Sequence, residues 1–208
     1  MIYRQINLSD LEGNRELNQI YDLLEEWVEE DEQPVKLYQS DCLRWSFIMS
    51  QLSSYESLLD VGVGQGQFIH ALNLMSKFKK LVGIDIKIYP GMKRLMKEYS
   101  TSNLFKIMDV INLQFSDQEF DIVTCMECLE HLEIPAFNAA LKELRRVCRK
   151  QLLITVPFQE NPLPKYHKQS FDVPQLEQYF PQAEKIILNY KNKTNWVLIR
   201  EEILVKNT

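Results

Sequence analysis

The 208-residue chain is poor in glycine and proline, with six and eight of them, which excludes collagen-like and low-complexity proteins. It has only four cysteines, too few for a disulfide scaffold, so a cytoplasmic setting is expected. It lacks any apolar run of ~18 residues, and its first residues lack the apolar core of a secretory signal. Neither a membrane span nor a leader is therefore expected.

The chain also lacks a basic excess, because its formal net charge is −5. Residues 1–33 hold ten acids and two bases, a net charge of −8, so the remaining residues sum to +3. A body so close to neutral does not indicate nucleic-acid binding. The basic run 142–150 lies on a stretch with helical periodicity, and a solvated helix face is its expected role.

The length corresponds to about 1.4 average domains, which predicts one domain with an appendage. Apolar periodicity predicts an amphipathic helix over 17–27, and a second helix follows Pro34 over 35–52. We expect these helices to form an N-terminal extension or lid, residues 1–52, on a body of residues 53–208. The lid would cover the open ends of the strands described next.

From residue 57 the chain alternates short apolar runs with helical stretches, which favours a parallel sheet with helices on both faces. The expected strands are 57–61, 80–84, 104–107, 120–125 and 152–156. The expected helices are 67–76, 91–99 and 136–148. The last two apolar runs, 185–189 and 196–201, leave no room for a helix between them and predict an antiparallel hairpin. The fold class is α/β, with a mostly parallel sheet of seven strands.

The first strand ends in a loop that holds three of the six glycines, Gly62, Gly64 and Gly66. Glycine allows sharp turns and close approach of a ligand to the backbone. The helix that follows offers unpaired N–H groups, so the pattern predicts a small-molecule site, with a purely structural turn as the alternative. The spacing G-x-G-x-G differs from the dinucleotide fingerprint G-x-G-x-x-G, and a Walker Gly-Lys-Ser/Thr sequence is absent.

Together with Asp60, this loop resembles the first motif of the class I S-adenosylmethionine (SAM) dependent methyltransferases, an acid followed by G-x-G-x-G. Three later segments match the family in order: the strand end at Asp85, the pair Asp109–Val110, and the run 120–132. The resemblance covers about 57–203 and implies a Rossmann-like, doubly wound sheet with SAM as cofactor. The residues implied to bind that cofactor are Asp60, Gly62, Gly64, Gly66, Asp85, Ile86, Asp109, Val110 and Met126.

The resemblance also implies a role for each of these positions. The glycine loop and Asp60 would meet the amino-acid end of SAM, Asp85 the ribose hydroxyls, and Asp109 with Val110 the adenine. Carboxylates are suited to accept hydrogen bonds from hydroxyl and amino groups. The alternatives from the residues alone are that Asp85 caps the next segment and that Asp109 is a turn residue.

The loop after the fourth strand lies on the substrate side of an open α/β sheet and holds Glu127, Glu130 and His131. Histidine transfers protons near neutral pH, so His131 is a candidate general base, with a positioning role as the alternative. His167 lies in a proline-stiffened segment, 161–172, that resembles the family segment over the substrate pocket. We expect Glu127, Glu130, His131 and His167 to form the catalytic set, although a structural role for His167 stays open.

Two carboxylates and two imidazoles could instead bind a divalent metal. The small-RNA 3′-terminal ribose methyltransferases use a Glu-x-x-Glu-His sequence and a later His in this way. The present chain departs from that family around His167, so no metal is expected. Cys125 and Cys128 form an isolated C-x-x-C and are expected to pack.

These expectations combine into a SAM-dependent methyltransferase that acts on a small-molecule or sugar-type acceptor, with oxygen as the favoured atom. The alternatives are a metal-dependent RNA ribose methyltransferase and a non-catalytic SAM-binding protein. A nicotinamide oxidoreductase is disfavoured by the loop spacing. The expected partner is a small molecule rather than a membrane or a nucleic acid, and no oligomeric state is predicted.

Overall fold

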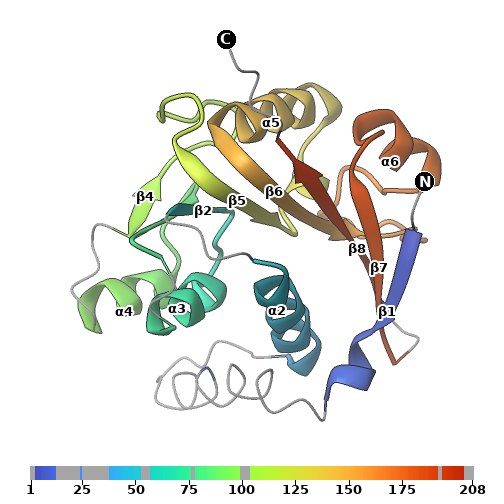
Figure 1. The fold of residues 1–208 in the computed structure, drawn as a ribbon, viewed down its shortest axis with the longest axis horizontal. Coiled ribbons are helices and arrows are strands. Elements are labelled where there is room, and N and C mark those ends of the chain that lie inside the picture. Colours follow the sequence, from blue (N-terminus) through green and yellow to red (C-terminus); the bar gives the residue numbers. More distant parts are fainter. Residues whose placement is uncertain are drawn as a thin grey trace.

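The computed structural model describes residues 3–12, 24, 38–52, 57–75, 78–98, 104–191 and 194–203. An eight-stranded sheet crosses the molecule, in the order β1-β7-β8-β6-β5-β2-β3-β4 (Figure 1). The strands are β1 (Tyr3–Asn7), β2 (Ser57–Val61), β3 (Lys80–Asp85), β4 (Phe105–Ile107), β5 (Phe120–Met126), β6 (Cys148–Pro157), β7 (Glu184–Tyr190) and β8 (Thr194–Glu202). The α-helices are α2 (Gln39–Gln51), α3 (Gln67–Leu74), α4 (Pro90–Glu98), α5 (Ile134–Val147) and α6 (Val173–Tyr179), and short 3-10 helices cover Leu8–Leu11 (η1) and Leu129–His131 (η2).

The expected α/β fold class is confirmed, including the mixture of strand directions. The strands β6, β5, β2, β3 and β4 pair in parallel, and β8 pairs antiparallel with both β6 and β7. The expected terminal hairpin is therefore β7 and β8. Leu188 of β7 and Leu198 of β8 are buried in the same apolar cluster as residues of α2 and α3.

The sheet has eight strands rather than the seven expected, because residues 3–7, for which no element was predicted, form a strand. β1 pairs in parallel with β7, so its backbone groups find partners along the sheet edge. The Tyr3 hydroxyl also donates a hydrogen bond to Glu177 at 2.9 Å. The strand is short and largely polar, so it lacks the alternation by which a strand is identified in a sequence.

The two helices expected in the N-terminal extension have different outcomes. The helix expected over 17–27 lies outside the described residues, except that Leu24 is helical and buried. The helix expected over 35–52 is α2, which begins at Gln39. The division of the chain into residues 1–52 and 53–208 stays a prediction.

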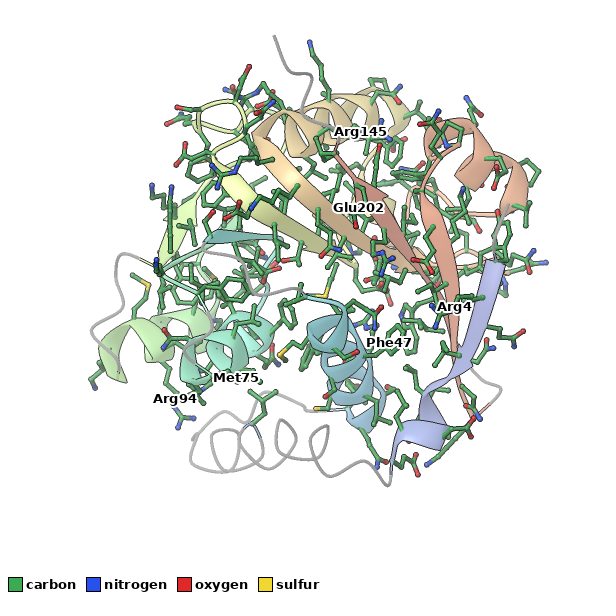
Figure 2. All side chains as sticks on the ribbon, viewed as in Figure 1. Arg4, Phe47, Met75, Arg94, Arg145 and Glu202 are labelled. Atoms are coloured by element: carbon green, nitrogen blue, oxygen red, sulfur yellow. The ribbon has the colours of Figure 1, made fainter. Side chains whose placement is uncertain are left out.

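Helices cover both faces of the sheet. On one face, α2 and α3 bury Phe47 and Phe68 in a common apolar cluster, and Phe47 can be located on α2 in Figure 2. On the other face, α5 and α6 bury Phe137 and Leu176. The parallel strands β2, β3 and β5 all run in one direction, so their carboxyl ends, and the loops that follow them, meet at one edge of the sheet. Within the described residues, no helix is both long and apolar enough to cross a membrane.

Candidate functional site

The glycine loop after β2 has the backbone that its sequence predicts. Gly62, Gly64 and Gly66 have φ values of 78°, 55° and 91°, in the left-handed region that favours glycine. A Cβ atom on Gly64 would meet nothing within 4 Å, whereas one on Gly66 would lie 2.8 Å from the Cδ1 atom of Leu95. Gly64 therefore faces open space, whereas Gly66 lies beside the Leu95 side chain of α4.

A cavity of about 460 Å³ lies above this loop and is called the glycine-loop cavity below. Its wall includes six of the residues expected to bind a cofactor: Gly62, Gly64, Asp85, Ile86, Asp109 and Val110. The other three expected residues lie beside the wall rather than on it. Asp60 is buried beneath the loop, Gly66 begins α3, and Met126 packs in the cluster around α2 and α3. Glu127 and Cys128, which directly follow Met126, line the cavity instead.

Asp85 connects the end of β3 to the glycine loop. One of its carboxylate oxygens accepts a hydrogen bond from the Gly64 N–H at 2.9 Å, and the other accepts one from the Ile86 N–H at 2.7 Å. A carboxylate oxygen has more than one lone pair, so both oxygens can still accept a bond from a ligand in the cavity. Asp85 thus both shapes the loop and presents a negative charge to the cavity.

Asp60 lies below the loop and is 2% exposed. Its carboxylate accepts a hydrogen bond from the Thr124 hydroxyl at 2.7 Å. Burial raises the pKa of Asp60 to about 7, and the negative charge of Asp85 adds to this effect. Asp60 is therefore a buried acid that titrates near neutral pH, directly under the backbone that the cavity exposes.

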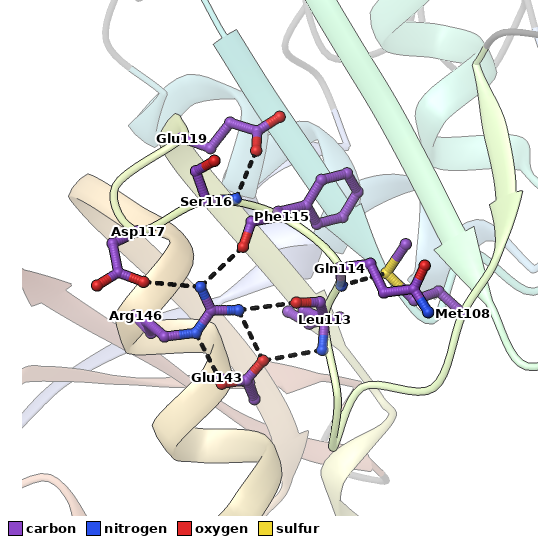
Figure 3. A network of polar contacts seen from close by, with 9 residues as sticks. All are labelled: Met108, Leu113, Gln114, Phe115, Ser116, Asp117, Glu119, Glu143 and Arg146. Carbon is purple, nitrogen blue, oxygen red and sulfur yellow. Dashed lines mark hydrogen bonds and ion pairs between the residues drawn. The ribbon is translucent and has the colours of Figure 1, made fainter.

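The long loop between β4 and β5 carries Asp109 and Val110 near its start. Asp109 is also a turn residue, because its carboxylate accepts a hydrogen bond from the Ile111 N–H at 3.1 Å. The loop is held by Arg146 of α5 (Figure 3). The guanidinium donates to the carbonyl oxygens of Leu113 and Phe115, each at 2.8 Å, and forms ion pairs with Glu143 and Asp117. The basic run 142–150 is thus more than a solvated face, because Arg146 fixes the loop that carries two cavity residues.

A second cavity, of about 640 Å³, adjoins the first and is called the histidine cavity below. Glu127 and His131 line both cavities, so they stand at the boundary between them. All four residues expected to be catalytic line the histidine cavity: Glu127, Glu130, His131 and His167. The loop after β5 and the segment after β6 therefore do come together, as the sequence predicts.

Glu127 is held by residues from two other elements. Its φ of 50° is unusual for a non-glycine residue. Its carboxylate forms an ion pair with Arg44 of α2 at 2.8 Å and accepts a hydrogen bond from the Thr155 hydroxyl at 2.9 Å. Burial raises the pKa of Glu127, and the Arg44 charge partly opposes this rise. The side chain is fixed at the boundary of the two cavities.

Glu130 is 1% exposed, and its Oε2 atom has no hydrogen-bond partner among the described residues. Burial raises the pKa of Glu130 to about 9, and the nearby charge of Glu127 adds to this effect. Burial thus favours the protonated, uncharged form of this carboxyl group. In that form it can donate a hydrogen bond as well as accept one.

The two histidines lie close together, with ring centroids 5.0 Å apart. The Nδ1 atom of His131 lies 3.1 Å from the carbonyl oxygen of Tyr166, and its Nε2 atom lies 3.9 Å from the Glu130 carboxyl. The Nδ1 atom of His167 lies 2.5 Å from the carboxylate of Glu160. Both imidazoles are thus oriented by acceptors on the segment that follows β6.

Three of the four residues considered as metal ligands are grouped as that alternative requires. Donor atoms of Glu130, His131 and His167 lie within 4.8 Å of one another. Glu127 is not a member of this group, because Arg44 and Thr155 hold its carboxylate. Cys125 is buried and Cys128 is partly buried, and neither forms a disulfide.

Several residues of the histidine cavity were not identified from the sequence, among them Asp41, Arg44, Glu160 and Trp196. Asp41 and Arg44 form an ion pair at 3.1 Å, and the Arg44 guanidinium lies 4.7 Å from the ring centre of Trp196. The only local signal was the spacing of Asp41 and Arg44, one helical turn apart. Contacts to Glu127 and Trp196 depend on the tertiary fold, which the sequence pattern does not reveal.

Comparison with known proteins places this geometry in a family context. Residues 59–154 match a family described as a methyltransferase domain. A ubiquinone biosynthesis O-methyltransferase from Hydrogenovibrio crunogenus is 32% identical over 137 residues, covering 62% of this chain and 56% of that protein. Another from Serratia proteamaculans is 31% identical over 105 residues, covering 48% of this chain and 43% of that protein. The chain spans about half the length of these curated relatives.

Solved structures share the fold over most of the chain. A 1,6-didemethyltoxoflavin-N1-methyltransferase from Burkholderia thailandensis, with bound 1,6-didemethyltoxoflavin and S-adenosylhomocysteine, has a TM-score of 0.65 at 15% identity. The match covers 95% of this chain and 87% of that one. The cyclase SpnF has a TM-score of 0.61 at 16% identity, covering 90% and 95% of the two chains. Because a cyclase shares it, the fold by itself does not determine the reaction.

Proposed function

We propose that this chain, which carries a methyltransferase domain at residues 59–154 and has the class I methyltransferase fold, transfers a methyl group from SAM to a small-molecule or sugar-type acceptor, with oxygen as the favoured atom. One observation carries the proposal. The glycine-loop cavity and the histidine cavity adjoin each other, and Glu127 and His131 line both. A donor and an acceptor bound in the two cavities would meet at these residues.

The residues of the glycine-loop cavity fit SAM. The open space over Gly64 would be filled by a Cβ atom, so the loop admits a ligand close to its backbone. Asp85 presents carboxylate oxygens that suit a pair of ribose hydroxyls, and Ile86, Met108 and Val110 give the same cavity an apolar wall for a flat base. Bound SAM supplies a methyl group on a sulfonium, so the chain's own residues need only align the acceptor and take up a proton.

The charges of the histidine cavity favour an uncharged acceptor. Its wall holds four carboxyl groups and a single guanidinium, that of Arg44, which already pairs with Asp41 and Glu127. An anionic acceptor would be repelled there. Hydroxyl groups suit the mixture of donors and acceptors on the wall, and an imidazole can accept the proton that a hydroxyl must lose.

Calorimetry with SAM, S-adenosylhomocysteine and NAD tests the cofactor. We expect both SAM and S-adenosylhomocysteine to bind, and Asp85→Ala to weaken binding by ~1.5–3 kcal/mol, the range for hydrogen bonds to a charged group. Glu202→Ala is the matched control, because this exposed carboxylate lies on β8. Binding of NAD instead of SAM, or unchanged affinity in Asp85→Ala, would contradict the assignment.

Turnover tests the reaction itself. Tritium from the labelled methyl group of SAM is followed into a panel of catechols, neutral sugars and nitrogen heterocycles, with sugar phosphates and RNA as anionic comparisons. We expect labelling of neutral hydroxyl compounds and little labelling of anions. Tight SAM binding without transfer to any compound would favour a non-catalytic SAM-binding protein.

A second candidate is metal-dependent methylation of an RNA ribose, which the grouping of Glu130, His131 and His167 favours. Under this alternative, a chelator would abolish transfer and Mg²⁺ or Mn²⁺ would restore it. His131→Ala and His167→Ala would then be equally damaging, since each removes a ligand. Chelator-resistant transfer to a neutral small molecule would exclude it.

A further inference from the structure

The contact between Glu160 and His167 distinguishes the two histidines of the cavity. The Nδ1 atom of His167 lies 2.5 Å from the Oε2 atom of Glu160, and the His167 side chain is 8% exposed. An ionised carboxylate only accepts hydrogen bonds, so Nδ1 must carry the proton. The Nε2 atom then holds a lone pair, and it is the ring nitrogen that Glu160 leaves available to a ligand in the cavity.

His131 has a weaker arrangement for accepting a proton. Its Nδ1 atom faces a backbone carbonyl, which is a dipole and not a charge. Its Nε2 atom faces the Glu130 carboxyl at 3.9 Å. The His131 side chain is 43% exposed. A carboxylate on the far nitrogen stabilises the protonated ring more than a carbonyl does. Of the two imidazoles, His167 is therefore the one whose ring has a carboxylate at hydrogen-bond distance on its far nitrogen.

The segment that carries Glu160 and His167 is fixed to the loop after β5. The Lys168 N–H donates to the Glu130 carbonyl oxygen at 2.7 Å. The Gln169 side chain donates to the carbonyl oxygens of Leu129 and Leu132, at 3.1 and 3.0 Å. These bonds hold His167 beside His131 before any ligand binds, which is the preorganisation that proton transfer requires.

We propose that His167 is the general base that takes the acceptor's proton, and that Glu160 is the positioning residue that sets its tautomer. This inference rests on the proposed methyl transfer to a hydroxyl. As the acceptor oxygen bonds to the methyl carbon, the carbon–sulfur bond breaks and its electron pair stays on sulfur. The hydroxyl proton moves to Nε2 of His167, and Glu160 balances the charge of the imidazolium that forms.

The tautomer can be measured without an acceptor. The chain has three histidines, so ¹⁵N-histidine-labelled full-length protein gives three rings to assign with His→Gln variants. We expect His167 to show a protonated Nδ1 and an unprotonated Nε2 in long-range ¹H–¹⁵N spectra. Glu160→Ala should convert most of this population to the other tautomer, while Glu133→Ala, a control at an exposed carboxylate, should not. A protonated Nε2 in the unaltered protein would overturn the proposal.

Turnover with catechol as the probe acceptor tests the role in catalysis. We expect His167→Ala to lower kcat by ~10²-fold or more and His131→Ala to lower it less. Glu160→Gln, which keeps the shape and removes the charge, should lower kcat by about tenfold or more with KM within about twofold. Equal losses in the two histidine variants, or an unchanged kcat in Glu160→Gln, would overturn the proposal.

Failure of this inference is distinguishable from failure of the proposed function. Loss of SAM binding, or transfer to nitrogen compounds only, would contradict methyl transfer to a hydroxyl. The ¹⁵N spectra of His167, with and without Glu160→Ala, would still show whether Glu160 sets the tautomer of that ring. Conversely, methyl transfer that resists a chelator, in a protein whose His167 is protonated at Nε2, would support the proposed function. It would contradict the assignment of His167 as general base and Glu160 as its positioning residue.

Discussion

Asp60 shows how one residue couples stability to pH. In an unfolded chain its pKa is near 3.9, whereas burial raises it to about 7 in the fold. Between these values the folded state binds more protons than the unfolded state. The contribution of Asp60 is therefore most favourable at acid pH and is lost as the pH rises through about 7.

Asp60→Asn should remove this dependence. An asparagine can still accept the Thr124 hydrogen bond through its side-chain oxygen but carries no charge. The quantity to compare is the unfolding free energy of the variant minus that of the unaltered protein. This difference should be roughly 2–4 kcal/mol more favourable to the variant at pH 8 than at pH 4. Urea denaturation of both proteins at the two pH values measures it, and a constant difference would show that folding does not shift the pKa of Asp60.

At the residue scale, the sequence predicted the residues whose role depends on the backbone next to them. Gly62 and Gly64 require left-handed φ, and Asp85 ends a strand, so both features are local in the sequence. Arg44 and Glu160 were missed because their roles arise only when distant segments meet. His167 was identified as a candidate, but its tautomer depends on the same long-range packing.

Helix α2 places two side chains in the wall of the histidine cavity, Asp41 and Arg44, and Arg44 reaches furthest across the site. Arg44 is 5% exposed and reaches from the helix to Glu127, and its guanidinium also lies over Trp196 of β8. Removing one partner of a buried ion pair leaves the other charge without compensation, which usually costs more than removing both. The pair therefore ties α2 to the loop after β5.

A double-mutant cycle tests this connection. Arg44→Met should lower the unfolding free energy by about 2 kcal/mol, because Glu127, whose side chain is 25% exposed, loses its cation in a half-buried site. Combining it with Glu127→Gln should recover part of the loss. Denaturation of the two single variants and the double variant gives the coupling energy, and strict additivity would show that the two side chains do not stabilise each other.

The loop between β4 and β5 is positioned by α5 on its outer side. Arg146 bonds to two of its carbonyl oxygens, so the cavity residues Asp109 and Val110 depend on a helix that does not itself line the cavity. Arg146→Met should weaken SAM binding several-fold through a less ordered loop, with little change at Lys142→Met on an exposed part of the same helix. Calorimetry measures the affinity of each variant for SAM. An affinity of Arg146→Met equal to that of Lys142→Met would limit Arg146 to a role in stability.

At the element scale, the sequence predicted the strands and helices that have regular apolar periodicity. The alternation from β2 to β6 and the terminal hairpin were both expected, because their apolar runs are long enough to identify. β1 was missed because it is polar and short, and its stability comes from pairing with β7, in which Tyr3 lies opposite Lys185, 182 residues later.

At the scale of the whole molecule, β1 is the edge strand that covers β7, so a shorter and more polar strand stands at this edge of the sheet. Without it, β7 would expose an unpaired row of backbone groups, which tends to pair with other chains. Deletion of residues 1–12 should therefore lower the melting temperature and cause self-association that grows with protein concentration. Thermal unfolding and light scattering measure the two effects, and a stable monomer after the deletion would show that β7 tolerates an open edge.

The shared wall of the two cavities has a consequence for inhibitor design. Glu127 and His131 border both spaces, so a single compound could occupy the two at once by passing beside these side chains. Joining an adenosine group to a neutral polyol through a short linker would make the second binding event intramolecular, with an effective concentration in the millimolar range. Such a bisubstrate compound would contact the charged side chains of the histidine cavity as well as the glycine loop.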